Sequence, residues 1–223
     1  LTITCTAVSL MCGIGGSANF NLAMGRGEKE EARRYAGNSI FLLFAIGLIL
    51  CLVVRIFLKP MMVLFGATPE VLDYSLTYTG ITSLGFPFLI LATGGSNLVR
   101  ADGSPRYSMV CTLAGAVINT ILDPLFIFGF HMGVQGAALA TILSQTVSAV
   151  WVLSFLCGKK SILRVRKENL KIKKAVLVPV LALGASPFIM QATECLVQLT
   201  YNSGMQHYGN DYYVGAMTIL FSI

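Results

Sequence analysis

The sequence predicts an all-α membrane protein, a bundle of transmembrane helices that crosses the bilayer several times. Only 12% of its 223 residues are charged, about half the share in a typical soluble domain, and 55% are hydrophobic. Apolar runs of the roughly 20 residues that a bilayer-spanning helix needs recur along the chain. Lys and Arg gather between these runs, without the interleaved aromatic residues of a nucleic-acid-binding face, so no nucleic-acid partner is expected.

Six spanning helices are predicted along the chain, followed by the start of a seventh. They cover roughly residues 1–24, 37–58, 71–99, 107–130, 134–157 and 175–201, and the seventh begins near residue 212. The first opens without a Met and the last apolar run is too short to span a bilayer, so we expect a piece of a longer protein. Gly-rich "GIGGSANFNLAMG" in the first span predicts close helix–helix contact, and Pro87 in the third predicts a kink or hinge.

The charges between the spans predict the orientation of the protein. Loops 25–34, 99–106 and 158–174 hold fourteen of the sixteen Lys and Arg residues, whereas the alternate connections hold only Arg55 and Lys59. Because positive loops remain on the cytoplasmic side, these three loops are expected in the cytoplasm and the protein in the plasma membrane.

Catalytic and cofactor signatures do not occur in the sequence. None of the six cysteines forms a C-x-x-C pair, so reduced, buried thiols are expected rather than zinc ligands or disulfides. The nucleophile elbow, the H-E-x-x-H zinc motif and the phosphate-binding loop are also missing. We therefore expect neither an enzyme nor a cofactor.

A carboxylate in the fourth span predicts a cation site. Asp123 costs several kcal/mol in hydrocarbon, and Asn119 lies one helical turn earlier on the same face. Pro124 has no N–H for the carbonyl of Thr120, which leaves another oxygen available. Thr141, at a matching depth in the fifth span, adds a hydroxyl. Oxygen ligands of this kind suit Na⁺, and the carboxylate could equally take a proton; the alternative is a structural polar cluster.

A second group of polar residues lies in the sixth span. Gln191, Glu194, Gln198 and Asn202 recur every three or four residues and so form one helix face, which favours a water-filled substrate cavity. A polar seam between helices is the alternative. Pro187 lies upstream and is expected to kink the helix.

These motifs resemble the multidrug and toxic compound extrusion (MATE) family of secondary transporters. The resemblance rests on "GRGEKEEARRYAGNS", "LFGATPEVLDYSLTY", "LVRADGSPRYSM", "INTILDPLFIF" and "GVQGAALATILSQ", which follow one another over residues 13–150. "PFIMQATECLVQLTYNSGMQHYGND" extends it beyond the basic segment.

The resemblance implies twelve helices in two six-helix lobes. Residues 1–157 would be five helices of the first lobe without its first helix, 158–174 the linker between lobes, and 175–223 the start of the second lobe. It also implies that Asn119, Asp123 and Thr141 belong to the Na⁺ or H⁺ site, which an acidic residue of the missing helix completes. Glu194 would lie in the helix where some members bind ions or drugs.

Three functions remain open at this point. The first is a cation-coupled antiporter, monomeric in its full-length form, that exports cationic or amphipathic drugs. The second is a flippase for lipid-linked or other amphipathic cargo, which a basic cavity lining would favour; no Lys or Arg is expected inside the spans beyond Arg55. The third is a membrane scaffold without transport, which predicts a fully packed polar stripe.

Overall fold

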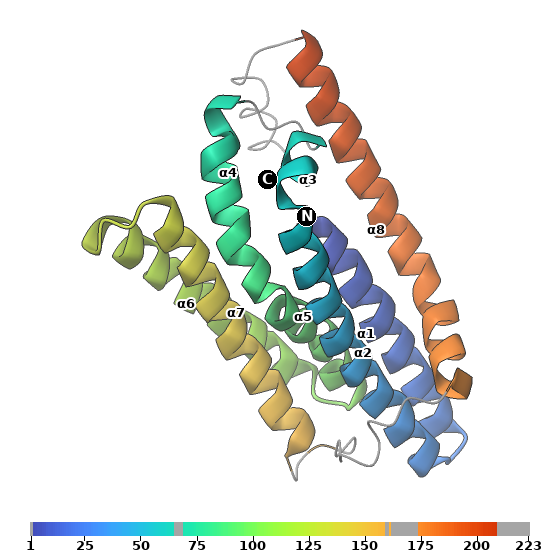
Figure 1. The fold of residues 1–223 in the computed structure, drawn as a ribbon. Helices are drawn as coiled ribbons and strands as arrows, with labels where there is room; N and C mark the ends of the chain where they lie inside the picture. Colours follow the sequence, from blue (N-terminus) through green and yellow to red (C-terminus); the bar gives the residue numbers. More distant parts are fainter. Residues whose placement is uncertain (1, 65–68, 159–160, 162–173, 209–223) are drawn as a thin grey trace.

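The computed structural model describes residues 2–64, 69–158, 161 and 174–208, and this part of the chain is built from helices without a strand. The elements, in order, are α1 (Thr2–Gly25), α2 (Lys29–Ile56), α3 (Leu58–Leu64), α4 (Pro69–Thr82), the 3₁₀ turn η1 (Ser83–Gly85), α5 (Phe86–Ala101), α6 (Pro105–Pro124), the π-helical turn η2 (Leu125–Gly129), α7 (Val134–Cys157) and α8 (Lys174–Tyr208). Figure 1 shows them as an elongated bundle.

Six helical stretches of the described residues are long and apolar enough to cross a membrane, which confirms the predicted number of complete spans. They are Thr2–Gly25, Lys29–Ile56, Leu72–Ala101, Pro105–Gly129, Val134–Cys157 and Val176–Tyr201. Most linker positions and the predicted seventh helix lie outside the described residues.

Two predicted loops are largely helical instead. Residues 29–34 form the first turns of α2, and residues 202–208 continue α8. Glu30 and Glu31 lie in the first turn of α2, where the helix dipole stabilises negative charge. Arg33 pairs with Glu30 at 3.2 Å one turn on. The charged residues at this end therefore interrupt the apolar run but not the helix.

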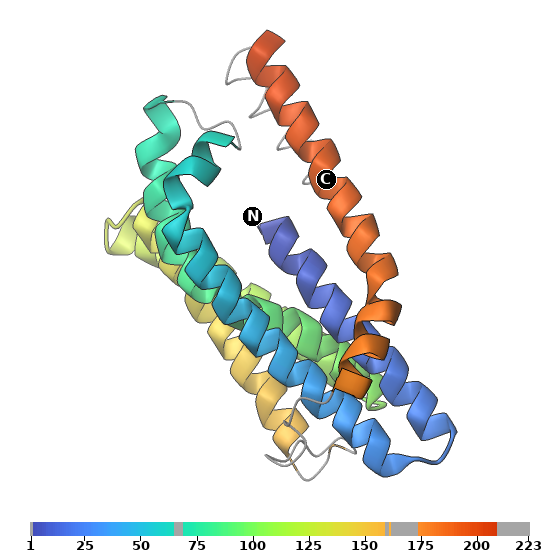
Figure 2. The same cartoon turned by 45° about the vertical axis from the view of Figure 1, so that its right-hand side comes forward.

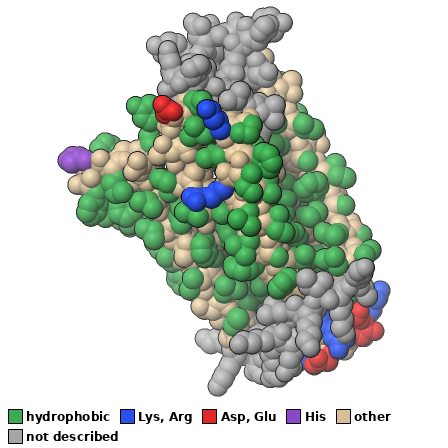
Figure 3. Space-filling view, in the orientation of Figure 1, with side chains coloured by type: hydrophobic (Ala, Val, Ile, Leu, Met, Phe, Trp, Pro, Cys, Tyr) green, Lys and Arg blue, Asp and Glu red, His purple; other side chains and the backbone are tan. Residues whose placement is uncertain are grey.

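Two short turns define one end of the bundle, which we call the basic end. These are residues 26–28 between α1 and α2 and residues 102–104 between α5 and α6. α7 also ends, and α8 also begins, at this end (Figures 1 and 2). In Figure 3 hydrophobic side chains cover the middle of the visible face, and acidic and basic side chains gather over the α1–α2 turn. This pattern fits a bundle whose middle lies in lipid.

Helix α1 is the packing centre of the bundle, because it contacts α2, α5 and α8. Its glycines make this possible, as the close-packing prediction requires. A Cβ at Gly13 would lie 2.7 Å from the Cα of Gly94 in α5, and one at Gly16 would meet the Ser39 side chain in α2. A Cβ at Gly15 would overlap the carbonyl oxygen of Val180 in α8. Small residues of this kind let helix backbones approach closely in lipid.

Candidate functional site

At the predicted kink in the third span, a short 3₁₀ turn interrupts the α-helix. The 3₁₀ turn Ser83–Gly85 separates α4 from α5, and Pro87 lies in the first turn of α5, where a missing N–H costs nothing. A Cβ at Gly85 would lie 3.0 Å from Cγ1 of Ile142, so α7 packs directly against the break.

Pro124 also marks a change of helix type, at the end of α6. The following five residues, Leu125–Gly129, form a π-helical turn. A Cβ at Gly136 of α7 would lie only 2.9 Å from the carbonyl group of Phe126, so the two helices are in close contact here. π-Helical turns inside longer helices occur frequently at functional sites. Pro187, by contrast, lies inside a continuous α8.

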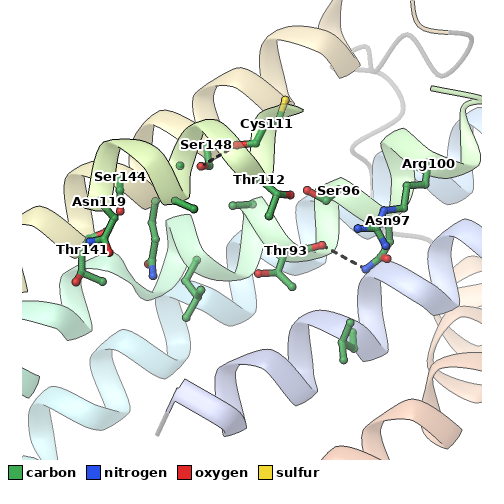
Figure 4. Close-up of a pocket in the computed structure, with 16 residues that line it drawn as sticks. Thr93, Ser96, Asn97, Arg100, Cys111, Thr112, Asn119, Thr141, Ser144 and Ser148 are labelled. Atoms are coloured by element: carbon green, nitrogen blue, oxygen red, sulfur yellow. Dashed lines mark hydrogen bonds between the residues drawn. The ribbon is translucent and has the colours of Figure 1, made fainter. Parts of the chain in front are cut away.

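The structure brings the three predicted cation ligands to the pair formed by α6 and α7. Asn119 Nδ2 donates a hydrogen bond to Asp123 Oδ1 at 3.4 Å, and both side chains are half-buried. Asn119 and Thr141 line one cavity and lie next to each other in Figure 4. Asp123 does not itself line that cavity. Its carboxylate is therefore linked to the cavity through the Asn119 amide.

This cavity has a volume of about 450 Å³ and runs between α5, α6 and α7, with Leu10 of α1 also in its lining. Most of its lining was not predicted from the sequence, although its polar residues recur every three or four positions on α5 and α7 and lie seven positions apart on α6. Besides Asn119 and Thr141, the polar lining residues are Thr93, Ser96, Asn97, Arg100, Thr112, Ser144, Gln145 and Ser148.

The hydroxyl groups of the cavity present oxygen lone pairs rather than protons. Four of them donate their only proton to a backbone carbonyl oxygen. The donors are Thr112, Thr141, Ser144 and Ser148, the acceptors are Ser108, Ala137, Thr141 and Cys111, and the distances are 3.1, 2.9, 2.9 and 3.4 Å. A hydroxyl whose proton is used in this way can only accept a further hydrogen bond. The lining therefore suits a cation or water.

Arg100 corrects the expectation that the spans hold no basic residue beyond Arg55. It lies in the last turn of α5, and among the residues that line the cavity in the described part of the chain it alone carries a formal charge. Its Nε donates to Ser108 Oγ at 3.2 Å, and the Ser108 hydroxyl donates to the Ser96 carbonyl at 3.1 Å. These bonds hold the guanidinium at the basic end of the cavity.

The predicted stripe on α8 forms a separate polar group. Gln191 Nε2 donates to Glu194 Oε2 at 2.6 Å; Glu194 is exposed, while Gln191 and Gln198 are half-buried. None of the three lines the cavity along α5, α6 and α7. The side chain of Asn202 lies outside the described residues.

Metal-ligating chemistry of the zinc type is not found in the described residues. All six cysteines are free, and no group of three or more His, Cys, Asp or Glu side chains comes together there. Asn119, Asp123 and Thr141 offer oxygen atoms, which are the ligands that hard cations take.

Comparisons with known proteins agree on one family. The family model MatE matches residues 1–125. The multidrug export protein MepA of Staphylococcus aureus is 30% identical over 198 residues, which are 89% of this chain and 44% of that protein. MepA of Staphylococcus haemolyticus is 29% identical, again over 89% of this chain and 44% of that protein. A crystal structure of MATE in the bent conformation has a TM-score of 0.85 at 23% identity, over 96% of this chain and 48% of that one. The chain thus spans about half the length of the relatives that it matches.

Proposed function

This chain belongs to the MatE family, and on that premise we propose that it forms part of an antiporter that exports cationic or amphipathic drugs in exchange for Na⁺ or H⁺. The Asn119–Asp123 hydrogen bond beside the polar cavity carries this proposal. The relatives named as multidrug export proteins support the drug-like substrate.

The chemistry of the pair supports exchange of an ion. A carboxylate at this depth is expensive to keep charged in hydrocarbon, so it gains most from a bound cation or proton. The amide group of Asn119 points its NH₂ toward Asp123, which leaves the amide oxygen available to a cation. Binding at this pair would then favour one of two conformations of the whole transporter, because only a ligand with different affinities for two states can shift their balance.

In this proposal the basic end faces the cytoplasm and the protein lies in the plasma membrane. Of the Lys and Arg residues whose side chains are described, Arg26, Lys29, Arg33, Arg34, Arg100 and Arg106 lie at that end, and Arg55 and Lys59 lie toward the other. The stripe of Gln191, Glu194 and Gln198, in which Glu194 is exposed, would contact the organic cation. An acidic side chain in that position complements a positive substrate.

Asp123→Asn in the full-length transporter tests the proposal. Because the amide cannot ionise, ion-driven drug export in proteoliposomes should fall to background, while expression and the melting temperature of the purified protein stay near those of the parent. Asp73→Asn, an exposed carboxylate on α4, is the matched control and should keep full export. Ion-driven export by Asp123→Asn at the parent rate would contradict the assignment.

One observation favours a second candidate, a flippase for anionic or lipid-linked cargo. The guanidinium of Arg100 gives the cavity the basic residue that such cargo requires. Parallel transport assays with an organic cation and with a lipid-linked sugar separate the two functions. Transport of the lipid-linked sugar alone would replace the antiporter proposal.

A further inference from the structure

We propose that the cavity along α5, α6 and α7 is a water-filled passage through which the coupling cation reaches the cytoplasm, and that Arg100 is its electrostatic barrier. This inference rests on the proposed antiport and adds a route and a residue that limits leak. It places the ion route inside this group of helices rather than along the drug route.

The position of the cavity fits a passage. Its lining on α5 runs from Leu89 to Arg100, about 16 Å at 1.5 Å per helical residue. That is roughly half of the 30 Å thickness of the hydrocarbon layer. The lining begins at the level of Asn119 and Thr141 and ends in the last turn of α5, at the basic end. It therefore joins the candidate ion site to one surface.

The lining also has the chemistry of a passage. Hydroxyl oxygens from α6 and α7 follow one another along it, and their protons are already donated to backbone carbonyls. Asn97 donates its amide N–H to the Thr93 carbonyl at 3.2 Å and so retains its amide oxygen for a guest (Figure 4). Ion pathways replace a hydration shell with oxygens of this kind. A volume of about 450 Å³ has room for on the order of ten water molecules.

Arg100 carries a positive charge, whereas the hydroxyl groups of the lining present oxygen lone pairs. It lies exposed at the basic end, and its guanidinium is held by a hydrogen bond to Ser108, which in turn bonds to the Ser96 carbonyl. A positive residue that lines a passage raises the barrier for cations. Water and lone pairs thus favour entry of a cation from the Asn119 end, and Arg100 limits its free movement when no drug is exported.

The test measures passive cation entry into proteoliposomes that hold the full-length transporter, without drug, using radioactive Na⁺ or an internal pH-sensitive dye. Arg100→Gln should raise passive entry about tenfold, which corresponds to about 1.4 kcal/mol in the barrier. Arg100→Lys keeps the positive charge and should keep passive cation entry at the parent level. Arg106→Gln removes one positive charge near the same turn but not from the cavity, and should leave entry at the parent level.

A second variant tests the passage itself and does not depend on Arg100. Ala116 lines the cavity on α6, whereas Ala114 on the same helix does not. Ala116→Leu should block the passage and slow ion-driven export, with cation binding to the detergent-solubilised protein retained. Ala114→Leu should leave export unchanged.

The outcomes separate the two proposals. If the parent exports drug without any dependence on Na⁺ or H⁺, the antiport is wrong and the passage with it. If the parent is coupled but Arg100→Gln leaks no more than Arg106→Gln, Arg100 is not the barrier. If Ala116→Leu then also exports at the parent rate, the cavity is not the ion route.

Discussion

The α1–α8 contact and the α6–α7 contact join helices in opposite ways. At Gly15 and Gly184 the backbones of α1 and α8 touch directly, and Thr4 Oγ1 and Cys195 Sγ form a side-chain hydrogen bond between the two helices at 3.9 Å. Between α6 and α7, polar side chains border a cavity. Backbone contact fills the space between helices and leaves nothing to bind, whereas hydroxyl groups that donate their protons to backbone carbonyls leave oxygens for a guest.

The largest effect is expected where backbones touch. In Gly184→Ala the new Cβ would overlap the carbonyl oxygen of Met11 and lie 2.7 Å from its carbonyl carbon, so α1 and α8 must move apart. We expect a loss of about 1–3 kcal/mol, the usual cost of overpacking. Thermal melting of the detergent-solubilised full-length protein measures it.

Gly204→Ala is the matched control on the same helix, because a Cβ there meets nothing within 4 Å. Its melting temperature should stay the same or rise slightly, since Ala favours helix over Gly. Equal losses in Gly184→Ala and Gly204→Ala would show that the backbone contact does not stabilise the protein.

A smaller effect, and one that can be reversed, is expected beside the cavity. In Gly115→Ala the new Cβ would overlap the Ser148 hydroxyl, but it would lie 3.4 Å from the Ser148 Cβ. The single variant should lose about 1–2 kcal/mol of stability. The double variant Gly115→Ala/Ser148→Ala should recover most of that loss. A double variant that melts as low as Gly115→Ala would mean that the helices themselves, rather than one hydroxyl, resist the methyl group.

The smallest effect is expected from Ser148→Ala alone. It removes one long hydrogen bond, from Ser148 Oγ to the Cys111 carbonyl at 3.4 Å, and interhelical bonds of this kind average about 0.6 kcal/mol in membranes. The melting temperature should fall by about a degree or two at most. Ser154→Ala removes a hydrogen bond to Val150 within α7 and should lower the melting temperature by less. A larger loss of stability in Ser154→Ala than in Ser148→Ala would contradict the greater weight given to the hydrogen bond between two helices.

The spans were predictable because hydropathy reports the cost of burying each residue in lipid. That cost does not depend on neighbours. The break just before Pro87 was predictable from the chemistry of proline, and the matching depth of Asp123 and Thr141 was a prediction from the rise of a helix. The first turns of α2 were missed because charged residues lower hydropathy while Glu30 and Arg33 still support a helix. The end of α8 was missed for a related reason, since residues 202–208 are mostly polar yet helical.

The cavity was not predicted because it depends on the rotation of three helices about their own axes. Thr112 and Ser148 are ordinary helix residues until α6 and α7 turn them toward each other. Arg100 was assigned to a loop by its charge, but α5 continues through it. Asn119 and Asp123 share one face of α6, so their positions along the helix, one turn apart, place Asn119 at the cavity and leave Asp123 linked to it by a hydrogen bond.

The glycine contact between α1 and α8 has a consequence for biosynthesis. α1 leaves the ribosome first and α8 last among the described helices, yet α1 is the main partner of α8. The surface of α1 around Gly15 must therefore stay vacant while α2, α5 and the helices after them insert. A newly made α8 then finds a docking groove that earlier helices have already shaped, and the most distant pairing among the described helices is the last of them to form.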